Sequence, residues 1–238
     1  LTMANIYSII VDNYYQSSPV GIDLLNNLNK KNILFLHIPK TAGTSLRKTN
    51  IIKVTDHIIH PIHKDGPTKY IEEKSLEDYF KFAFVRNPWD RFVSLYFYFF
   101  NMKENNIAYQ FDHKVVKTIQ SFKSFKDFCL NYWDFSASLL KMKTNEVNSF
   151  KRHGKFHFYP QSKWTHYNNK RIANFIGRFE NLNQDVRQLE DTLGINHSVI
   201  PHKNKSHHRY YKDYYDQKMI DVVAEIYEED VNNFNYCY

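Results

Sequence analysis

Two short, continuous apolar runs stand out along the chain, Ile33 to Ile38 and Phe82 to Val85. Unbroken apolar runs of this length are typical of strands that are buried on both faces of a parallel sheet. The first run stops at Pro39, which cannot donate a hydrogen bond to a sheet. A third run, Ile172 to Gly177, has the same character. The pattern therefore predicts three buried strands.

Helical periodicity lies between and after these runs. Asn87 can cap a helix, and Pro88 suits the first helical position. Apolar residues then recur at intervals of three and four: Phe92, Leu95, Tyr96 and Phe99. Further helices are predicted over Phe122 to Tyr132, over Asn181 to Leu193 before Gly194, and along the apolar stripe that follows Asp216. Alternating strands and helices predict an α/β fold with a central parallel sheet flanked by helices.

Length and composition agree with this fold class. A chain of 238 residues suits one domain, residues 1–238, with 1–30 as an N-terminal extension and 33–236 as the core. A formal net charge of +7 favours polyanionic partners, including nucleotides, acidic polysaccharides and nucleic acids. The two cysteines, Cys129 and Cys237, lie far apart and match neither a metal site nor a redox motif.

The segment after the first predicted strand, His37 to Ser45, carries the most informative chemistry. Small residues at Ala42 and Gly43 allow the backbone to approach an anion, and the free N–H groups of a helix start point toward it. Its other polar groups are the ammonium of Lys40 and the hydroxyls of Thr41, Thr44 and Ser45. It is not a Walker A loop, because the first glycine of that motif is missing and the lysine precedes the glycine.

A second anion-binding position is predicted at the end of the second strand. Arg86 follows that strand, and Ser94 lies about two turns into the next helix, so both can face one ligand at the sheet edge. Two such anchors suit a nucleotide with two phosphate groups. Arg91 of the same helix is interpreted as a solvated residue, and Trp89 as core or rim packing.

These segments resemble motifs of the carbohydrate sulfotransferases of the family 2 type, which use 3′-phosphoadenosine-5′-phosphosulfate (PAPS). Residues 38–45, IPKTAGTS, resemble the 5′-phosphosulfate loop. Residues 84–96, FVRNPWDRFVSLY, resemble the 3′-phosphate motif, in which an arginine and a serine at the places of Arg86 and Ser94 bind the 3′-phosphate. Two later segments, 176–182 and 201–206, are also similar, and the second adds Lys205 and Ser206 to the expected nucleotide site.

The resemblance spans Ile33 to Tyr236 and implies a P-loop-like sulfotransferase fold. PAPS is then the co-substrate, 3′-phosphoadenosine-5′-phosphate (PAP) is the product, and no metal is expected. Sulfuryl transfer resembles phosphoryl transfer, so Lys40 is expected to neutralise the leaving group. The hydroxyls and N–H groups of residues 41–45 are expected to hold the 5′-phosphate and the sulfonate oxygens.

A general base is expected between the two motifs, where relatives use histidine or glutamate. That interval holds three histidines, His57, His60 and His63, and three glutamates, Glu72, Glu73 and Glu77. We favour His63, then His60, with His157 as a further candidate near the acceptor. The three histidines do not predict a metal site, because Pro61 interrupts a helix there and neither cysteine nor clustered carboxylate completes the ligand shell.

The expected acceptor is a hydroxyl-bearing molecule, a glycan, recognised by loops over Asn101 to Lys117 and Asn145 to Lys170. The positive charge favours an acidic or already sulfated glycan, and we expect no nucleic-acid partner. No stretch approaches the 18 to 20 or so apolar residues that span a bilayer, and the start lacks a signal-peptide layout. We expect a soluble, cytoplasmic enzyme, the alternative being a Golgi-type anchor outside this sequence. The sequence indicates no oligomeric state.

Two other classes of protein compete with this interpretation. A kinase-like nucleotide enzyme would need an acidic residue at a strand end to hold Mg²⁺, where this chain has Arg86 and Asn87. A noncatalytic basic module that binds nucleic acid or glycan is favoured by the net charge and by the aromatic and basic residues from His202 to Tyr215. That module leaves the two anion-binding positions at strand ends unexplained.

Overall fold

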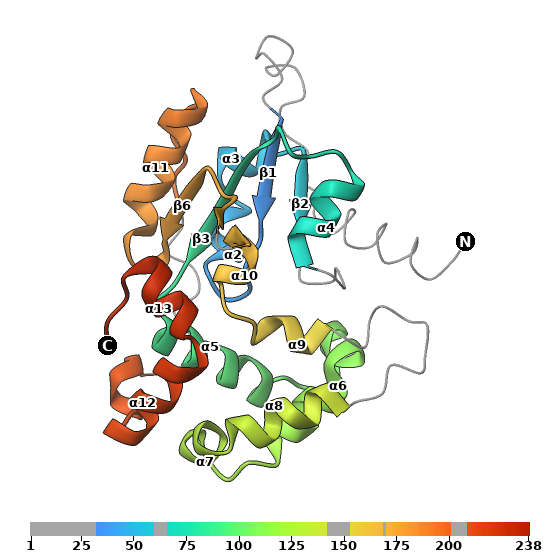
Figure 1. Ribbon diagram of the computed structural model, residues 1–238, viewed down its shortest axis with the longest axis vertical. Coiled ribbons are helices and arrows are strands. Elements are labelled where there is room, and N and C mark those ends of the chain that lie inside the picture. Colours follow the sequence, from blue (N-terminus) through green and yellow to red (C-terminus); the bar gives the residue numbers. More distant parts are fainter. Residues whose placement is uncertain (1–31, 60–65, 142–152, 169, 201–208) are drawn as a thin grey trace, which may run out of the picture. The chain divides into compact units, whose positions relative to one another are not determined.

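Four parallel strands form the central sheet in the order β2-β1-β3-β6 (Figure 1). The computed structural model describes residues 32–59, 66–141, 153–168, 170–200 and 209–238, and Asn32 to Tyr238 cluster as one compact unit. The strands are β1 (Ile33–Leu36), β2 (His57–Ile59), β3 (Phe80–Val85) and β6 (Phe175–Arg178). The predicted α/β fold with a parallel sheet flanked by helices is therefore confirmed.

Two of the strands lie where the apolar runs predicted them, and two differ. The third run was predicted over Ile172 to Gly177, whereas β6 starts at Phe175 and pairs Val85 with Arg178. The sequence analysis missed β2, because it has only three residues and a histidine begins it. A separate antiparallel pair joins β4 (His166–Tyr167) and β5 (Lys170–Arg171).

Successive side chains of β1 and β3 point to opposite faces of the sheet and build two cores. Phe35, Phe82 and Phe84 pack with Val186 and Leu189 of α11 (Leu182–Leu193) on one face. The α3 helix (Asn50–Lys53) packs on this face too, and Figure 1 shows α11 on the β6 side of the sheet and α3 near the upper part of β1. The opposite face packs against a larger aromatic cluster.

The larger cluster is centred on α5 (Pro88–Phe100), which begins directly after β3. Phe92 of α5 stacks on Phe128 at 5.2 Å between ring centroids and contacts Tyr132 at 5.4 Å and Tyr227 at 6.1 Å. Trp89 is buried and its Nε1 donates to the Ile220 carbonyl at 3.0 Å, so its predicted packing role is confirmed. Helix α5 is thus held firmly at the end of the strand that carries Arg86.

The other helices on this side correct several predicted boundaries. Their bounds are α6 (Ile107–Gln120), α7 (Phe125–Leu130), α8 (Tyr132–Lys141), α9 (His153–His157), α10 (Ser162–Thr165), α12 (Gln217–Ile226) and α13 (Glu228–Phe234). The predicted acceptor loop Asn101 to Lys117 is wrong in its larger part, because α6 buries Val115, Val116 and Ile119 in the cluster. The second predicted loop contains α9 and α10.

The predicted helix Phe122 to Tyr132 begins later, and a break at Asn131 separates α7 from α8. The C-terminal stripe is likewise two helices, divided at Tyr227, whose fully buried side chain closes the cluster. Further elements are α4 (Gly66–Glu73), the short helix α2 (Gly43–Leu46) and two short 3-10 turns, η3 (Phe179–Asn181) and η4 (Tyr211–Tyr214).

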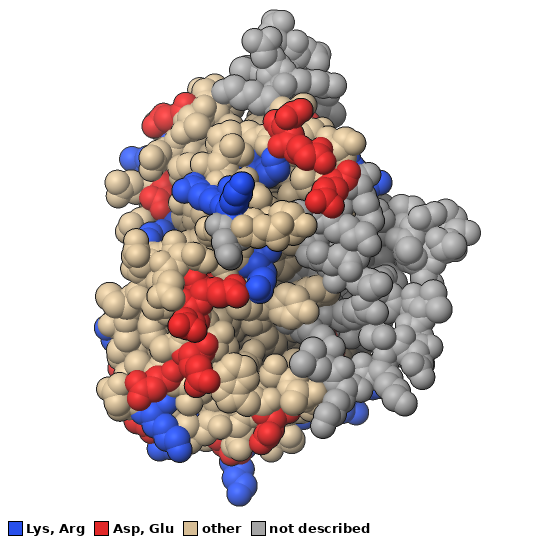
Figure 2. Space-filling view, in the orientation of Figure 1, with Lys and Arg blue, Asp and Glu red and all other residues tan. Residues whose placement is uncertain are grey.

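Charged side chains of both signs are interspersed on the face shown in Figure 2, with no large area of one sign among the described residues. Within the described part of the chain, no helix combines the length and the apolar character that crossing a bilayer would require.

Candidate active site

The turn that follows β1, residues 37–42 (the β1 turn), bends through two unusual backbone positions. Lys40 has φ 68° and Ala42 has φ 77°, both in the left-handed region that non-glycine residues rarely occupy. Such positions cost about 1–3 kcal/mol each and cluster at functional sites. Left-handed residues that alternate with right-handed ones turn successive N–H groups toward one point, which forms an anion-binding concavity.

A short helix, α2 (Gly43–Leu46), begins directly after the turn. The Ala42 carbonyl accepts hydrogen bonds from the N–H groups of Ser45 at 2.9 Å and Leu46 at 3.0 Å, which closes the first helical turn. No side chain in the described part of the chain caps this helix start. The N–H groups of Gly43 and Thr44 come before these two and have no acceptor within the helix, so they could bind a ligand.

A glycine is required at position 43 because His37, the residue that follows β1, lies close to it. A Cβ atom at Gly43 would lie 2.1 Å from Nε2 of His37, so any larger residue would displace the histidine ring. The small residues predicted to let the backbone bend therefore differ in their roles. Ala42 occupies a strained position, whereas Gly43 makes room for a neighbouring side chain.

The three hydroxyls of the segment are also used differently. Thr41 is fully buried and its Oγ1 donates to the Ile38 carbonyl at 2.9 Å, so this hydroxyl stabilises the turn itself. Thr44 is exposed and Ser45 is half-buried. The hydroxyls at the helix start are therefore accessible to a ligand, and Thr41 can contribute only through its backbone N–H.

Lys40 carries its ammonium into the site from the strained turn. Its Nζ lies 4.4 Å from the ring centroid of Tyr98, a residue of α5. Burial, followed by repulsion from the Arg86 guanidinium, lowers the pKa of Lys40 from 10.5 to about 8. This combination indicates a site with an excess of positive charge, which an anionic ligand would balance.

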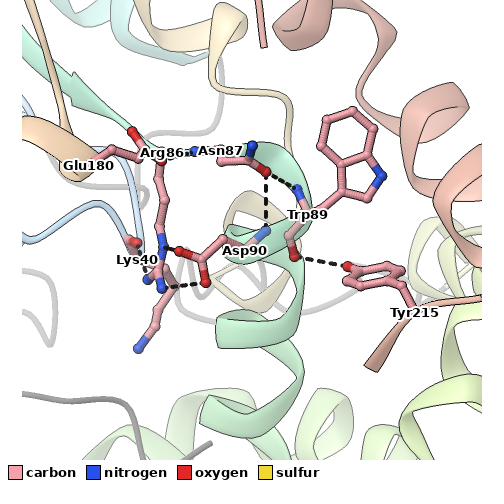
Figure 3. Close-up of polar contacts among 7 residues, drawn as sticks. All are labelled: Lys40, Arg86, Asn87, Trp89, Asp90, Glu180 and Tyr215. Atoms are coloured by element: carbon pink, nitrogen blue, oxygen red, sulfur yellow. Dashed lines mark hydrogen bonds and ion pairs between the residues drawn. The ribbon is translucent and has the colours of Figure 1, made fainter. Parts of the chain in front are cut away.

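Arg86 connects the β1 turn to the start of α5. Its Nε and Nη2 donate to the two carboxylate oxygens of Asp90, both at 2.8 Å, and its Nη1 donates to the Lys40 carbonyl at 3.2 Å (Figure 3). The guanidinium also lies 4.0 Å from the ring centroid of Phe179. These bonds use three of the five N–H donors of an arginine. Within the part of the chain that the structure describes, the other two donors have no hydrogen-bond acceptor.

Asp90 was not predicted as a residue of the site, although its position four residues after Arg86 indicated an ion pair between them. Asp90 lies four residues after Arg86 and carries the opposite charge, and it sits in the first turn of α5, where an acidic residue is favoured. The Asn87 cap was predicted and is confirmed, because its Oδ1 accepts from the Trp89 N–H at 3.1 Å and the Asp90 N–H at 3.4 Å. Figure 3 shows the Asn87 side chain joined to Trp89 and Asp90 at this helix start.

Arg91 corrects the sequence interpretation. The prediction of a solvated residue is wrong, because Arg91 is fully buried and donates to three backbone carbonyls. The acceptors are Pro39 at 3.1 Å, Tyr159 at 3.0 Å and His157 at 2.7 Å. Carbonyl acceptors compensate the loss of water around the guanidinium. Arg91 thereby fixes the β1 turn to α5.

Ser94 shares one face of α5 with two residues that contact the β1 turn. Arg91, Ser94 and Tyr98 are spaced three and four residues apart, which places them on one helical stripe. Arg91 contacts Pro39 and Tyr98 contacts Lys40, so the buried Ser94 between them lies on the face of α5 next to the turn.

The candidate bases fall into two groups. His60 and His63 lie outside the described residues, as do Lys205 and Ser206 of the expected nucleotide site. His57 is half-buried in β2 and its ring lies 5.5 Å from that of Tyr79. His157 is 6% exposed and stacks on Tyr98 at 5.7 Å between centroids, on the ring that contacts Lys40.

Comparisons with known proteins agree with this geometry. A model of the sulfotransferase family matches residues 26–237, nearly the whole chain. An uncharacterised protein of Archaeoglobus fulgidus is 24% identical over 126 residues, which cover 52% of this chain and 76% of that protein. No solved structure matches the chain. The family model includes both the β1 turn and the Arg86 motif, and the chain therefore belongs to the sulfotransferase family, whose members are PAPS-dependent transferases.

Proposed function

We propose that this protein transfers the sulfuryl group of PAPS to a hydroxyl of a carbohydrate acceptor, without a metal. One observation carries the proposal: the Arg86 Nη1 bonds the Lys40 carbonyl at 3.2 Å. This contact joins the two segments that the sequence predicts to bind anions, 46 positions apart, and so supports a single site. A nucleotide with phosphate groups at both the 5′ and 3′ positions fits a site with two cationic anchors.

Different residues of the site bind different parts of the nucleotide. Lys40 neutralises the charge that builds on the bridge oxygen as the bond to sulfur breaks. The hydroxyls of Thr44 and Ser45, with the N–H groups of Ala42 and Gly43, bind the 5′-phosphate and the sulfonate oxygens. Arg86 and Ser94 bind the 3′-phosphate, and Lys205 and Ser206 also belong to the nucleotide site.

The acceptor hydroxyl loses its proton to a histidine, His63 or, as second choice, His60. The position of β2 supports this assignment, because Ile59, its last residue, pairs with Leu36 at the end of β1. Parallel neighbours end at the same edge of a sheet, so the chain leaves β2 at the edge that carries the β1 turn. The net charge of +7 supports an acidic or sulfated glycan as the acceptor.

Calorimetric titration with PAP, ATP and 5′-AMP tests the nucleotide half of the proposal. We expect PAP to bind most tightly, and Arg86→Ala to weaken PAP binding by about 2 kcal/mol or more, because a charge-assisted phosphate contact is lost. Arg187→Ala, on the exposed face of α11, is the matched control and should bind like the wild type. Equal binding of ATP and PAP by the wild type would refute the proposal.

A transfer assay with PAPS and a panel of neutral, acidic and sulfated oligosaccharides tests the acceptor half. We expect the acidic members to be sulfated, and His63→Ala to lower kcat without changing PAP affinity, because a base acts on the acceptor alone. Full activity of both His63→Ala and His60→Ala would eliminate these residues as the base.

A further inference from the structure

Gln161 makes a paired contact with the backbone of Arg86 that the family motifs do not predict. Its Oε1 accepts from the Arg86 N–H at 2.8 Å, and its Nε2 donates to the Arg86 carbonyl at 2.8 Å. The β3 ladder ends at Val85, so the side-chain amide takes the place of a neighbouring strand for the next residue. Gln161 is fully buried, which makes both hydrogen bonds costly to lose.

A buried carboxylate decides which way round this amide lies. Asp230 of α13 accepts from the Gln161 backbone N–H at 2.8 Å and from Gln161 Nε2 at 3.2 Å through Oδ2. Its Oδ1 accepts from the Ser162 N–H at 2.8 Å. A carboxylate only accepts hydrogen bonds, so a flipped amide would set two pairs of acceptors against each other. Asp230 therefore fixes the amide in the orientation that pairs with Arg86.

Among the described residues, other contacts hold the neighbouring turn, and Gln161 alone bonds the Arg86 backbone. The Asn87 N–H donates to Glu180, and Asn87 Nδ2 donates to the Cys237 carbonyl at 2.9 Å. The Arg86 guanidinium is held separately, by Asp90. The bonds from Gln161 to Arg86 reach the main chain of Arg86 and not its guanidinium. Loss of Gln161 would therefore shift the backbone from which the Arg86 side chain extends, while the guanidinium would still be present.

We propose that Gln161, oriented by Asp230, is a positioning residue that sets the Arg86 side chain for the 3′-phosphate. The inference rests on the proposed function, in which Arg86 binds that phosphate. It makes the C-terminal helix α13 part of the nucleotide site, although no residue of α13 is expected to touch the nucleotide. Selectivity for the 3′-phosphate then depends on two residues that are 69 positions apart.

The test compares the affinities of PAP and 5′-AMP, which differ at the 3′-phosphate, by calorimetry. Gln161→Met keeps the side-chain length and loses both hydrogen bonds to Arg86, and Asp230→Asn loses an acceptor and so releases the amide orientation. We expect each to weaken PAP binding about tenfold or more while 5′-AMP binding changes little. Gln184→Met, exposed on α11, is the matched control.

Each result has one meaning for the inference. An unchanged ratio of the two affinities in both variants overturns it, whether both affinities fall together or neither falls, because a general structural role moves both nucleotides alike. If Gln161→Met does not fold, as judged by its thermal transition, Asp230→Asn decides by the same ratio. Failure of the proposed function is separate, since it shows in the wild type as binding that is indifferent to the 3′-phosphate.

Discussion

Replacing Lys40 by methionine should stabilise the protein in the absence of nucleotide and abolish its affinity for PAP. Lowering the Lys40 pKa from 10.5 to about 8 corresponds to about 3 kcal/mol against the charged form in the folded protein. The ammonium also lies 4.4 Å from the centroid of the Tyr98 ring, and this cation–π contact stabilises the charged form in the folded protein by about 0.5–2 kcal/mol. Methionine keeps the length of the side chain without its charge, so we expect a net gain of about 1–2 kcal/mol near neutral pH.

The gain should depend on pH in a defined direction. Below about pH 8 the lysine is charged in both folded and unfolded states, so the full cost of burying the charge is present. Between pH 8 and 10.5 the folded state loses its proton first and the wild type recovers stability. Above 10.5 both states are neutral and the difference vanishes.

Urea unfolding of the wild type and of Lys40→Met, near pH 7 and again near pH 9.5, measures the difference in their free energies of unfolding. Lys48→Met, at an exposed position shortly after α2, is the control. Excess PAP should raise the stability of the wild type and leave Lys40→Met unchanged, because a ligand stabilises only the state that it binds. A variant that is less stable than the wild type near pH 7, or a difference that does not change with pH, would refute the reasoning.

Three further predictions follow from the site. Gly43→Ala should displace His37, whose Nε2 would lie 2.1 Å from the new Cβ, and weaken PAP binding; titration beside the exposed control Lys48→Ala should show the larger loss for Gly43→Ala. Arg91→Met should lower the free energy of unfolding by about 3 kcal/mol or more, because three buried carbonyls lose their donor; a loss below about 1 kcal/mol in urea titration would contradict this. PAP binding near pH 8.5 should take up protons, since an anion raises the lowered pKa of Lys40; calorimetry in two buffers of different ionisation enthalpy should give different heats, and identical heats would contradict the coupling.

Local patterns predicted the elements whose stability is local. The apolar runs gave β1 and β3, and the Asn87–Pro88 pair gave the start of α5, because burial on both sheet faces and helix capping each leave a mark within a few residues. The predicted loop Asn101 to Lys117 failed for a different reason. Helix α6 in that segment is stabilised by packing against α5 and α9. The local pattern of apolar and polar residues does not show which other helices a segment packs against.

The candidate site divides in the same way. Lys40, Arg86 and Ser94 were predicted because their segments resemble known motifs, and the structure brings Lys40 and Arg86 into contact. Asp90 was within reach of the sequence, as an opposite charge four residues from Arg86. Gln161 was not, since a glutamine after a proline has no distinguishing chemistry until its partners are known.

The sequence by itself determined the family and the α/β class, and it predicted an anion-binding turn after β1, because these depend on residues close together in the chain. Only the tertiary structure decided that Arg91 is buried and that the Gln161 side chain forms hydrogen bonds with the Arg86 backbone. Burying a polar or charged side chain is favourable only where partners satisfy its hydrogen bonds. Those partners lie 52 to 75 residues away, at Pro39 for Arg91 and at Arg86 for Gln161, and folding alone brings them together.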